Sequence, residues 1–345
     1  MRAAVYYSKE NIQVRDWPAP EPTKDEVVVR VRYTGICGTD VAIYAGAHPR
    51  AVAPLIPGHE IFGRIEALGS TTDCQWQPGV RVVIYPLIAC GHCQACLEGN
   101  AHVCEHLGLV GIDRDGGFAE FVKVKAHQLV AIPNEISDEE AALVEPLAVA
   151  VHAVRESGFR PGDTVLVTGG GPIGNLTAQV ARASGARAVV ISEVKAFRRE
   201  RAHHLGFLTF NPPEEDAMQA LQRLLGRSSV VYEATGFTTA YEDAVCCCKV
   251  RGEISFVGIP KAPPEIDVQR IVFKELRTTS ARVYRIRDYQ EAIQLIRRRA
   301  VDLLPLITRV PLQDAIVGFS QMKAGETSLK ILLAPVNPVG SSPVA

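Results

Sequence analysis

The sequence predicts an α/β protein in which a doubly wound parallel sheet accompanies a second, β-rich domain. Two observations carry this prediction: a first third dominated by short apolar runs with Pro and Gly between them, and a strand–helix alternation that begins near residue 145. Alternation of this kind favours a parallel sheet covered by helices on both faces. The 345 residues are enough for two domains of ordinary size.

The first third supplies the β-rich part. Residues 1–7 and the β-branched run 27–33 are typical of strands, and the dipeptides Pro57-Gly58 and Pro78-Gly79 mark turns. We therefore expect a mostly β domain whose loops carry the chemistry.

The alternating part begins with a helix expected over residues 145–155 and a strand over residues 164–168, followed by glycines and a helical pattern at Ile173, Leu176 and Val180. The next expected elements are, in order, strand 188–192, helix 196–205, strand 230–233 and strand 253–257. Residues 337–345 are rich in Pro, Gly and Ser and are expected to be disordered.

Composition excludes several functions. The 37 basic and 38 acidic residues leave a formal charge of -1, which gives no reason to expect nucleic acid or an anionic membrane as a partner. The sequence has no apolar run of the roughly 18 residues that a membrane span needs, and its first residues lack the apolar core of a signal peptide. Nine cysteines, an odd number that includes the consecutive Cys246–Cys248, favour a reducing compartment and hence a cytoplasmic location.

A dinucleotide-binding fingerprint follows the strand at 164–168. Gly169, Gly171 and Gly174 match G-x-G-x-x-G, with Pro172 and Ile173 opening the helix. The first glycine permits the tight turn, the second lets a pyrophosphate approach, and the third allows helix–sheet packing. The helix N-terminus would hold the phosphates, whereas the alternative is a glycine-rich turn without a ligand.

Glu193 lies at the position where such sites carry an acidic residue for the adenine ribose. Its carboxylate would accept hydrogen bonds from the adenine-ribose hydroxyls and would repel the 2′-phosphate of NADP, which favours NAD. Lys195, Arg198 and Arg199 lie close by and would attract that phosphate. We therefore expect Arg198 to contact the cofactor.

Four cysteines within fifteen residues predict a structural zinc site. Cys90, Cys93, Cys96 and Cys104 supply four soft ligands that complete a tetrahedron without an open position. The alternative, thiols packed in a core, conflicts with the small and polar residues between them. His92, His102 and His106 are expected at the surface. Cys246–Cys248 are expected to pack within a helical stretch.

A second set of ligand types is spread over three loops. Cys37, His59, Glu60 and Glu145 offer one thiolate, one imidazole and two carboxylates. Mixed ligands that leave a position for water or substrate are typical of a catalytic zinc, which would lower the pKa of an alcohol and so ease hydride loss. Each of these residues alone would more often be a packing or surface residue, and the combination carries the prediction.

These motifs together resemble the zinc-containing medium-chain alcohol dehydrogenases, in particular the sorbitol, polyol and L-threonine dehydrogenase branch. The resemblance covers nearly the whole chain. It rests on residues 35–40, 57–60, 116–120 and 145–149, the four-cysteine lobe and the glycine fingerprint.

The resemblance implies roles for individual residues. Cys37 and His59 would bind the catalytic zinc, one of Glu60 and Glu145 would ligate it directly while the other acts through water, and Asp40 would accept the second ring N–H of His59. Thr39 would take the proton of the alcohol. Many relatives continue this relay with a histidine three residues later, where this sequence has Ala42.

Two routes for the proton remain open because of Ala42. Zinc-bound water with Glu60 or Glu145 forms one route. His152, seven residues after Glu145 and so on the same helix face, forms the other, unless it is simply a satisfied helix residue.

The resemblance further implies a GroES-like catalytic domain at 1–147 and 285–345, a Rossmann domain at 148–284, an active site in the cleft between them, and a homo-oligomer, either a tetramer or a dimer. Glu145 suits a hydroxyl-rich alcohol, and Arg282 would contact substrate hydroxyls unless it forms an interface salt bridge. The expected reaction is oxidation of a polyol or sugar-like secondary alcohol by NAD. The alternatives are L-threonine 3-dehydrogenase and a non-catalytic scaffold that binds NAD and zinc.

Overall fold

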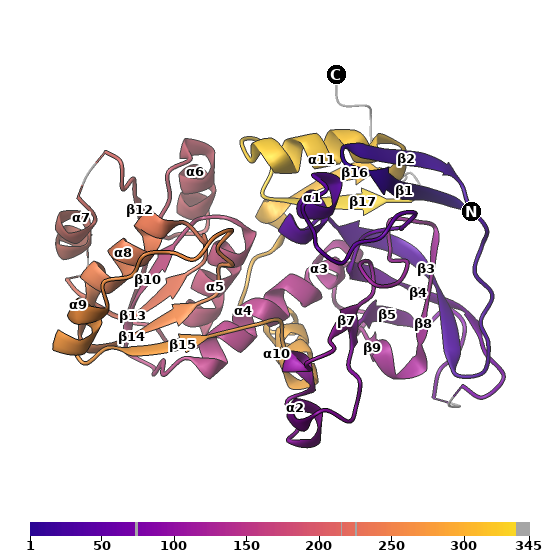
Figure 1. The fold of residues 1–345 in the computed structure, drawn as a ribbon, viewed down its shortest axis with the longest axis horizontal. Helices are drawn as coiled ribbons and strands as arrows, with labels where there is room; N and C mark the ends of the chain where they lie inside the picture. The colour runs from indigo at the N-terminus through magenta and orange to yellow at the C-terminus, as the bar shows by residue number, and fades with distance from the viewer. Residues whose placement is uncertain (73–74, 215, 225, 336–345) are drawn as a thin grey trace. The chain divides into compact units, whose positions relative to one another are not determined.

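The computed structural model describes residues 1–72, 75–214, 216–224 and 226–335. It divides into two compact units, one made of Met1–Glu145 with the chain from Leu306 onward, the other of Pro146–Pro305. Each unit contains its own sheet (Figure 1). The expected tail at 337–345 and Cys74 lie outside the described residues. Within those residues, no helix has the length and apolar character needed to cross a bilayer.

The first unit is β-rich, as expected. Its elements are β1 (Arg2–Ser8), β2 (Asn11–Asp16), β3 (Glu26–Gly35), α1 (Gly38–Tyr44), β4 (Glu60–Leu68), β5 (Arg81–Ile84), β6 (Leu87–Ile88), α2 (Gln94–Leu97), β7 (Gly108–Leu109), β8 (Phe121–Lys125), β9 (Leu129–Ala131), α3 (Asp138–Ala142), β16 (Ile307–Pro311), α11 (Ala315–Ala324) and β17 (Lys330–Ala334).

The main sheet of this unit, over the described residues, runs in the order β16-β17-β3-β4-β5-β9, with β8 also paired to β3. Strand β17 lies antiparallel to β3, so a strand from the end of the chain completes a sheet begun near its start. Alternate side chains of β3 and β4, including Val29, Val31 and Ile61, are buried in one apolar cluster. The sheet thereby brings residues near 35–40, 60 and 330 to the same region.

The second unit alternates strands and helices. Its elements are α4 (Val144–Glu156, whose first two residues belong to the other unit), β10 (Thr164–Thr168), α5 (Pro172–Ala183), β11 (Ala188–Ser192), α6 (Ala196–His204), β12 (Leu208–Phe210), α7 (Ala217–Leu224), β13 (Ser228–Glu233), α8 (Thr238–Cys247), β14 (Cys248–Phe256), α9 (Val268–Phe273), β15 (Arg277–Ser280) and α10 (Ile286–Arg297).

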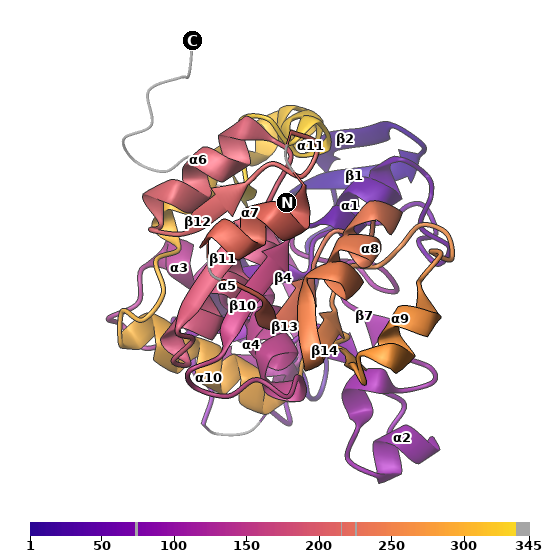
Figure 2. The same cartoon turned by 90° about the vertical axis from the view of Figure 1, so that its left-hand side faces the viewer.

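The sheet of the second unit is parallel throughout and has the strand order β12-β11-β10-β13-β14-β15 (Figure 2). The chain adds strands on one side of β10 and then returns to add strands on the other side. Because parallel crossovers are right-handed, this reversal places the helices of the two halves on opposite faces. The predicted doubly wound α/β fold is confirmed, and the reversal lies between β10 and β13.

Two details differ from the sequence-based expectations. The second unit extends to Pro305 rather than to 284, because α10 packs through Asp288 against His152 of α4 instead of belonging to the β-rich unit. The expectation that Cys246–Cys248 share a helix is wrong for Cys248, which begins β14. Cys247 and Cys248 are buried in the apolar cluster of this sheet, as expected of packing residues.

Candidate active site and metal centres

The structure gathers three of the predicted catalytic-zinc ligands. The ligand atoms of Cys37, His59 and Glu60 all lie within 4.8 Å of one another. Cys37 precedes α1, and Glu60 begins β4, which pairs with β3 through Gly35. A thiolate, an imidazole and a carboxylate at this spacing fit a zinc ion. Glu145, the fourth predicted residue, is buried, and its charge contributes to raising the pKa of His59.

Asp40 fixes the two turns that carry these ligands. One carboxylate oxygen accepts from the Cys37 N–H at 2.8 Å, and the other accepts from the Gly58 N–H at 3.2 Å. The expected hydrogen bond from His59 is not formed in this geometry, since Nδ1 of His59 lies 3.9 Å from Asp40 Oδ1. Asp40 thus holds the backbone of Cys37 and of Gly58, the residue before His59, and not the imidazole itself.

Charges around His59 favour its protonated form when no cation is bound. Burial lowers the pKa of His59, but the Asp40 carboxylate and the Cys37 thiolate outweigh burial and hold it well above its ordinary value. Anionic groups that stabilise a proton on this buried imidazole would also stabilise a metal cation bound in its place. Thr39 lies beside this cluster, with Oγ1 3.9 Å from Cys37 Sγ.

Lys330, on β17, belongs to this site and was missed from sequence. Its Nζ donates to both oxygens of Glu60, at 2.6 and 2.8 Å, and to the carbonyl of Ile36 at 3.2 Å. Burial lowers the pKa of Lys330, but the carboxylate of Glu60 and the thiolate of Cys37 outweigh burial, so the pKa is raised. A lone lysine far along the chain gives no spacing signal that could have identified it.

The four-cysteine lobe has the dimensions of a tetrahedral zinc site. Cys90 Sγ lies 4.0 Å from Cys96 Sγ, and Cys93 Sγ lies 3.8 Å from Cys104 Sγ. Four thiolates about 2.3 Å from a central ion stand about 3.8 Å apart, close to these two separations. All four sulfurs lie within 4.8 Å of one another, so the lobe fits a zinc ion.

Backbone N–H groups also point at the sulfurs of the lobe. Those of Glu105 and Cys96 lower the pKa of the Cys93 thiol to about 6, and that of Cys90 lowers the pKa of Cys104. Burial raises the pKa of Cys96 to about 12. These backbone N–H groups favour the thiolate forms of Cys93 and Cys104, and the thiolate is the form that binds zinc. Of the nearby histidines expected at the surface, His102 is instead buried, although its neighbours Ala101 and Val103 in the same 3₁₀ turn are exposed.

The glycine fingerprint has the geometry that its sequence predicts. Gly169 has a φ of 95°, which a residue with a side chain rarely adopts. A Cβ on Gly174 would lie 1.8 Å from the carbonyl oxygen of Gly169, whereas a Cβ on Gly171 would meet only Arg198, at 3.7 Å. The backbone at Gly174 is therefore packed too closely against Gly169 for any side chain, whereas the space beside Gly171 is free of other protein atoms except Arg198. Pro172 and Ile173 begin α5 directly after it.

Glu193 and Arg198 adjoin this turn. One oxygen of Glu193 accepts from the Gly170 N–H at 2.7 Å, and the other accepts from the Lys195 N–H at 2.8 Å. Arg198 lies 3.6 Å from the same carboxylate. Each carboxylate oxygen keeps a further lone pair, so Glu193 can hold the turn and still accept a ribose hydroxyl.

The two remaining predicted residues lie in the second unit. His152 is buried in α4 and its Nδ1 lies 2.8 Å from Asp288, which also pairs with Arg155. Arg282 follows β15 and is exposed. Its predicted contact with substrate stays a prediction.

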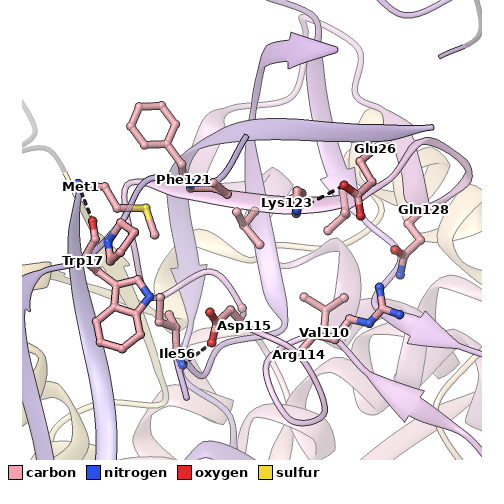
Figure 3. Close-up of a pocket in the computed structure, with 15 residues that line it drawn as sticks. Met1, Trp17, Glu26, Ile56, Val110, Arg114, Asp115, Phe121, Lys123 and Gln128 are labelled. Atoms are coloured by element: carbon pink, nitrogen blue, oxygen red, sulfur yellow. Dashed lines mark hydrogen bonds and ion pairs between the residues drawn. The ribbon is translucent and has the colours of Figure 1, made fainter. Parts of the chain in front are cut away.

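A further pocket lies in the first unit (Figure 3). Trp17 and Phe121 line it beside the ion pair Glu26–Lys123, and Asp115 accepts from the Ile56 N–H at 2.9 Å. None of the residues predicted to act in catalysis lines this pocket.

Comparison with known proteins shows the family of the chain. Residues 23–134 match the family described as alcohol dehydrogenase GroES-like domain, and residues 172–298 match the zinc-binding dehydrogenase family. The chain is 37% identical to the 2-dehydro-3-deoxy-L-galactonate 5-dehydrogenase of Pseudoalteromonas atlantica, over 96% of this chain and 98% of that protein. It is 33% identical to the L-threonine 3-dehydrogenase of a Chelativorans species, over 94% and 96%.

A solved structure agrees over the same length. A zinc-binding dehydrogenase candidate from Sinorhizobium meliloti, bound to NADP, is 33% identical with a TM-score of 0.91 and covers 97% of this chain and 99% of its own. The fold, the family matches and relatives above 30% identity along nearly the whole length lead to one conclusion. The chain belongs to the zinc-containing medium-chain alcohol dehydrogenase family.

Proposed function

We propose that this protein oxidises a secondary alcohol of a polyol or sugar-like molecule to a ketone, using a catalytic zinc, a structural zinc and NAD. The observation that carries the proposal is the convergence of Cys37, His59 and Glu60 in a chain that also has the dinucleotide turn at Gly169–Gly174. Zinc bound there would polarise the alcohol oxygen, and NAD would accept the hydride.

The chain's own residues would prepare the proton transfer. Cys37, His59 and Glu60 are proposed to hold the metal, with Glu145 beside them, because the first three are grouped within ligand distance. Thr39 is proposed to accept the alcohol proton, and its Oγ1 lies 3.9 Å from Cys37 Sγ. Glu60 forms an ion pair with Lys330, which stabilises its ionised form. We therefore propose Glu145 as the carboxylate that passes the proton onward.

The proposed substrate class rests on the site and on one relative. A buried glutamate beside the ligands suits a molecule with several hydroxyl groups, since its carboxylate would accept hydrogen bonds from them. The Pseudoalteromonas relative is named for a sugar-acid substrate. Arg282 is proposed to contact the substrate. The alternative, L-threonine 3-dehydrogenase activity, is favoured by the Chelativorans relative.

The test is NADH production at 340 nm with polyols, sugar acids, inositols and L-threonine, before and after zinc chelation. Chelator-sensitive turnover of a polyol or sugar acid supports the proposal, and turnover of L-threonine alone supports the alternative. Binding of zinc and dinucleotide without turnover of any alcohol would favour a non-catalytic scaffold.

NAD is proposed over NADP because the Glu193 carboxylate adjoins the turn and would repel a 2′-phosphate. Arg198 opposes this effect from 3.6 Å away, and the Sinorhizobium structure holds NADP. Comparison of kcat/KM for the two cofactors decides the matter, and a clear preference for NADP would overturn the assignment.

A homo-oligomer, dimer or tetramer, is also proposed, in a cytoplasmic, reducing environment. Strand β15 ends the sheet order of the second unit, and Val268, Val272 and Phe273 of α9 are exposed by 63%, 64% and 76%. Open sheet edges and apolar helix faces are usually covered. Analytical ultracentrifugation tests this, and a monomer at micromolar concentration would contradict it.

A further inference from the structure

A buried carboxylate that the proposed chemistry does not use lies at the end of β13. Glu233 is fully buried, with 0% of its surface exposed. Its Oε1 accepts three hydrogen bonds, from the N–H groups of Thr235 and Gly236 at 2.7 and 3.0 Å and from the hydroxyl of Thr235 at 2.5 Å. A buried charge is costly unless it is hydrogen-bonded, so this carboxylate stabilises one specific shape of the turn 234–236.

Thr235 connects this turn to the dinucleotide fingerprint. A Cβ on Gly169 would lie 2.6 Å from the Cγ2 methyl group of Thr235, so that methyl group occupies the side-chain space of the first fingerprint glycine. The N–H of Ala234 also donates to the carbonyl of Thr168 at 3.0 Å. The turn after β13 therefore packs directly on the turn after β10, its neighbour in the sheet (Figure 2).

The turn after β14 contacts the turn 234–236 on the side away from the glycine fingerprint. The carbonyl of Glu233 accepts from the N–H groups of Val257 and Gly258, both at 2.8 Å. A Cβ on Gly258 would lie 2.4 Å from the Gly236 nitrogen and 2.7 Å from Glu233 Oε2, so only glycine fits there. The turn 234–236 is thus held from both sides, at the carboxyl edge of the sheet and at the reversal of strand order, where doubly wound proteins bind nucleotides.

We propose that Glu233 and Thr235 are positioning residues that set the shape of the glycine turn 169–171, and thereby the affinity for the dinucleotide. The proposal rests on dinucleotide binding by this unit. Glu233 holds the Thr235 hydroxyl, which in turn accepts from the Phe237 N–H at 3.0 Å, and this leaves the methyl group pointing at Gly169. Binding is tightest when the phosphate-binding turn is already in its bound shape.

Two substitutions at one position separate the steric contact from the hydrogen bonds. Thr235→Ser keeps the hydroxyl and removes the methyl group, whereas Thr235→Val keeps the methyl group and removes the hydroxyl. Thr278→Ser, on the exposed strand β15, is the matched control. The readouts are the Kd for NADH by fluorescence, the melting temperature, and amide hydrogen exchange of residues 169–175.

Thr235→Ser is expected to weaken NADH binding roughly fivefold, the equivalent of one buried methyl group, and to speed exchange in residues 169–175. Thr235→Val keeps a methyl group facing Gly169 and keeps the bonds from the backbone N–H groups of residues 235 and 236 to Glu233. It is therefore expected to keep the Kd within about twofold, while the lost hydroxyl bond lowers the melting temperature. Glu233→Gln, whose amide oxygen still accepts, should weaken binding less than Glu233→Ala.

The reverse order, with normal binding by Thr235→Ser and weak binding by Thr235→Val, would overturn the proposal, as would unchanged exchange at residues 169–175 in Thr235→Ser. A wild-type protein that binds neither NADH nor NADPH would instead refute the proposed function. The exchange measurement would still show whether Thr235 controls the glycine turn.

Discussion

Lys330 donates to both carboxylate oxygens of Glu60, at 2.6 and 2.8 Å, although 270 residues separate the two in the chain. Both side chains are almost fully buried, with 3% and 1% exposed. The pair joins β17, at the end of the chain, to β4, which begins with a proposed zinc ligand. It places one positive charge next to a set of anionic ligands, and so it balances their charge before any cation binds.

Replacing Lys330 by Met should therefore be costly. It leaves Glu60 buried without its partner, and we expect a loss of about 3–5 kcal/mol in the free energy of unfolding, with reduced zinc content. Chemical denaturation and elemental analysis measure the two effects. The double variant Lys330→Met with Glu60→Gln should regain most of the stability, since no unpaired charge remains, but not the activity. Wild-type stability of the single variant would show that the pair is not formed.

The four-cysteine lobe should hold one zinc independently of the other site. Cys93→Ser is expected to lower the zinc content from about two ions per chain to about one and to reduce the melting temperature, because a tetrahedral site with three thiolates is incomplete. Cys246→Ser, which changes a thiol outside the lobe, is the control and should keep both ions. A full zinc complement in Cys93→Ser would refute the assignment.

The role of His152 is either proton transfer or structural support of the helix pair α4 and α10. Its Nδ1 is 2.8 Å from the buried Asp288, so we expect His152→Ala to lower the free energy of unfolding by about 1–3 kcal/mol because Asp288 loses a partner. We predict that pairing with Asp288, and not proton transfer, is the role of His152, so the pH profile of kcat should keep its shape. A flattened profile with unchanged stability would instead place His152 in the proton route.

Asp243, in α8, should make stability depend on pH. Burial, followed by the charges of Glu242 and Asp216, raises the pKa of Asp243 from 3.8 to about 6. Because this pKa is higher in the folded state, the stabilisation of the fold by the protonated carboxyl group is fully present below about pH 4. It is lost as the pH rises through about 6. Asp243→Asn should thus stabilise the protein at pH 7, by about 1 kcal/mol after solvent screening, and have little effect at pH 4. Equal effects at both pH values would contradict this account.

The sequence predicted most of the second unit because its signals are local. The strand expected at 164–168 matches β10 in both bounds, since a short apolar run ends there against glycines. The grouping of Cys37, His59 and Glu60 was predictable for a similar reason, because these residue types stand in short motifs. The same motifs did not show that Asp40 bonds to the backbone of Cys37 and Gly58 rather than to His59.

Features that depend on distant pairing were not predictable in this way. Nothing near Lys330 indicates Glu60 as its partner, because the pairing of β17 with β3 brings them together. Residues 285–305 were expected in the catalytic domain but lie in the second unit, because the sequence does not show against which element the helix at Ile286–Arg297 packs. Thr235 likewise has no motif that connects it to Gly169; the adjacency of β10 and β13 does so.

The most direct test of the central claim is zinc-dependent turnover at the site of Cys37, His59 and Glu60. The purified protein is depleted of zinc with a chelator, zinc is titrated back, and NADH formation is followed at 340 nm with the best alcohol substrate. The account predicts that activity is lost on depletion and restored by zinc in the wild type, but not in Cys37→Ser. Activity that survives removal of zinc, or that Cys37→Ser retains, would contradict it.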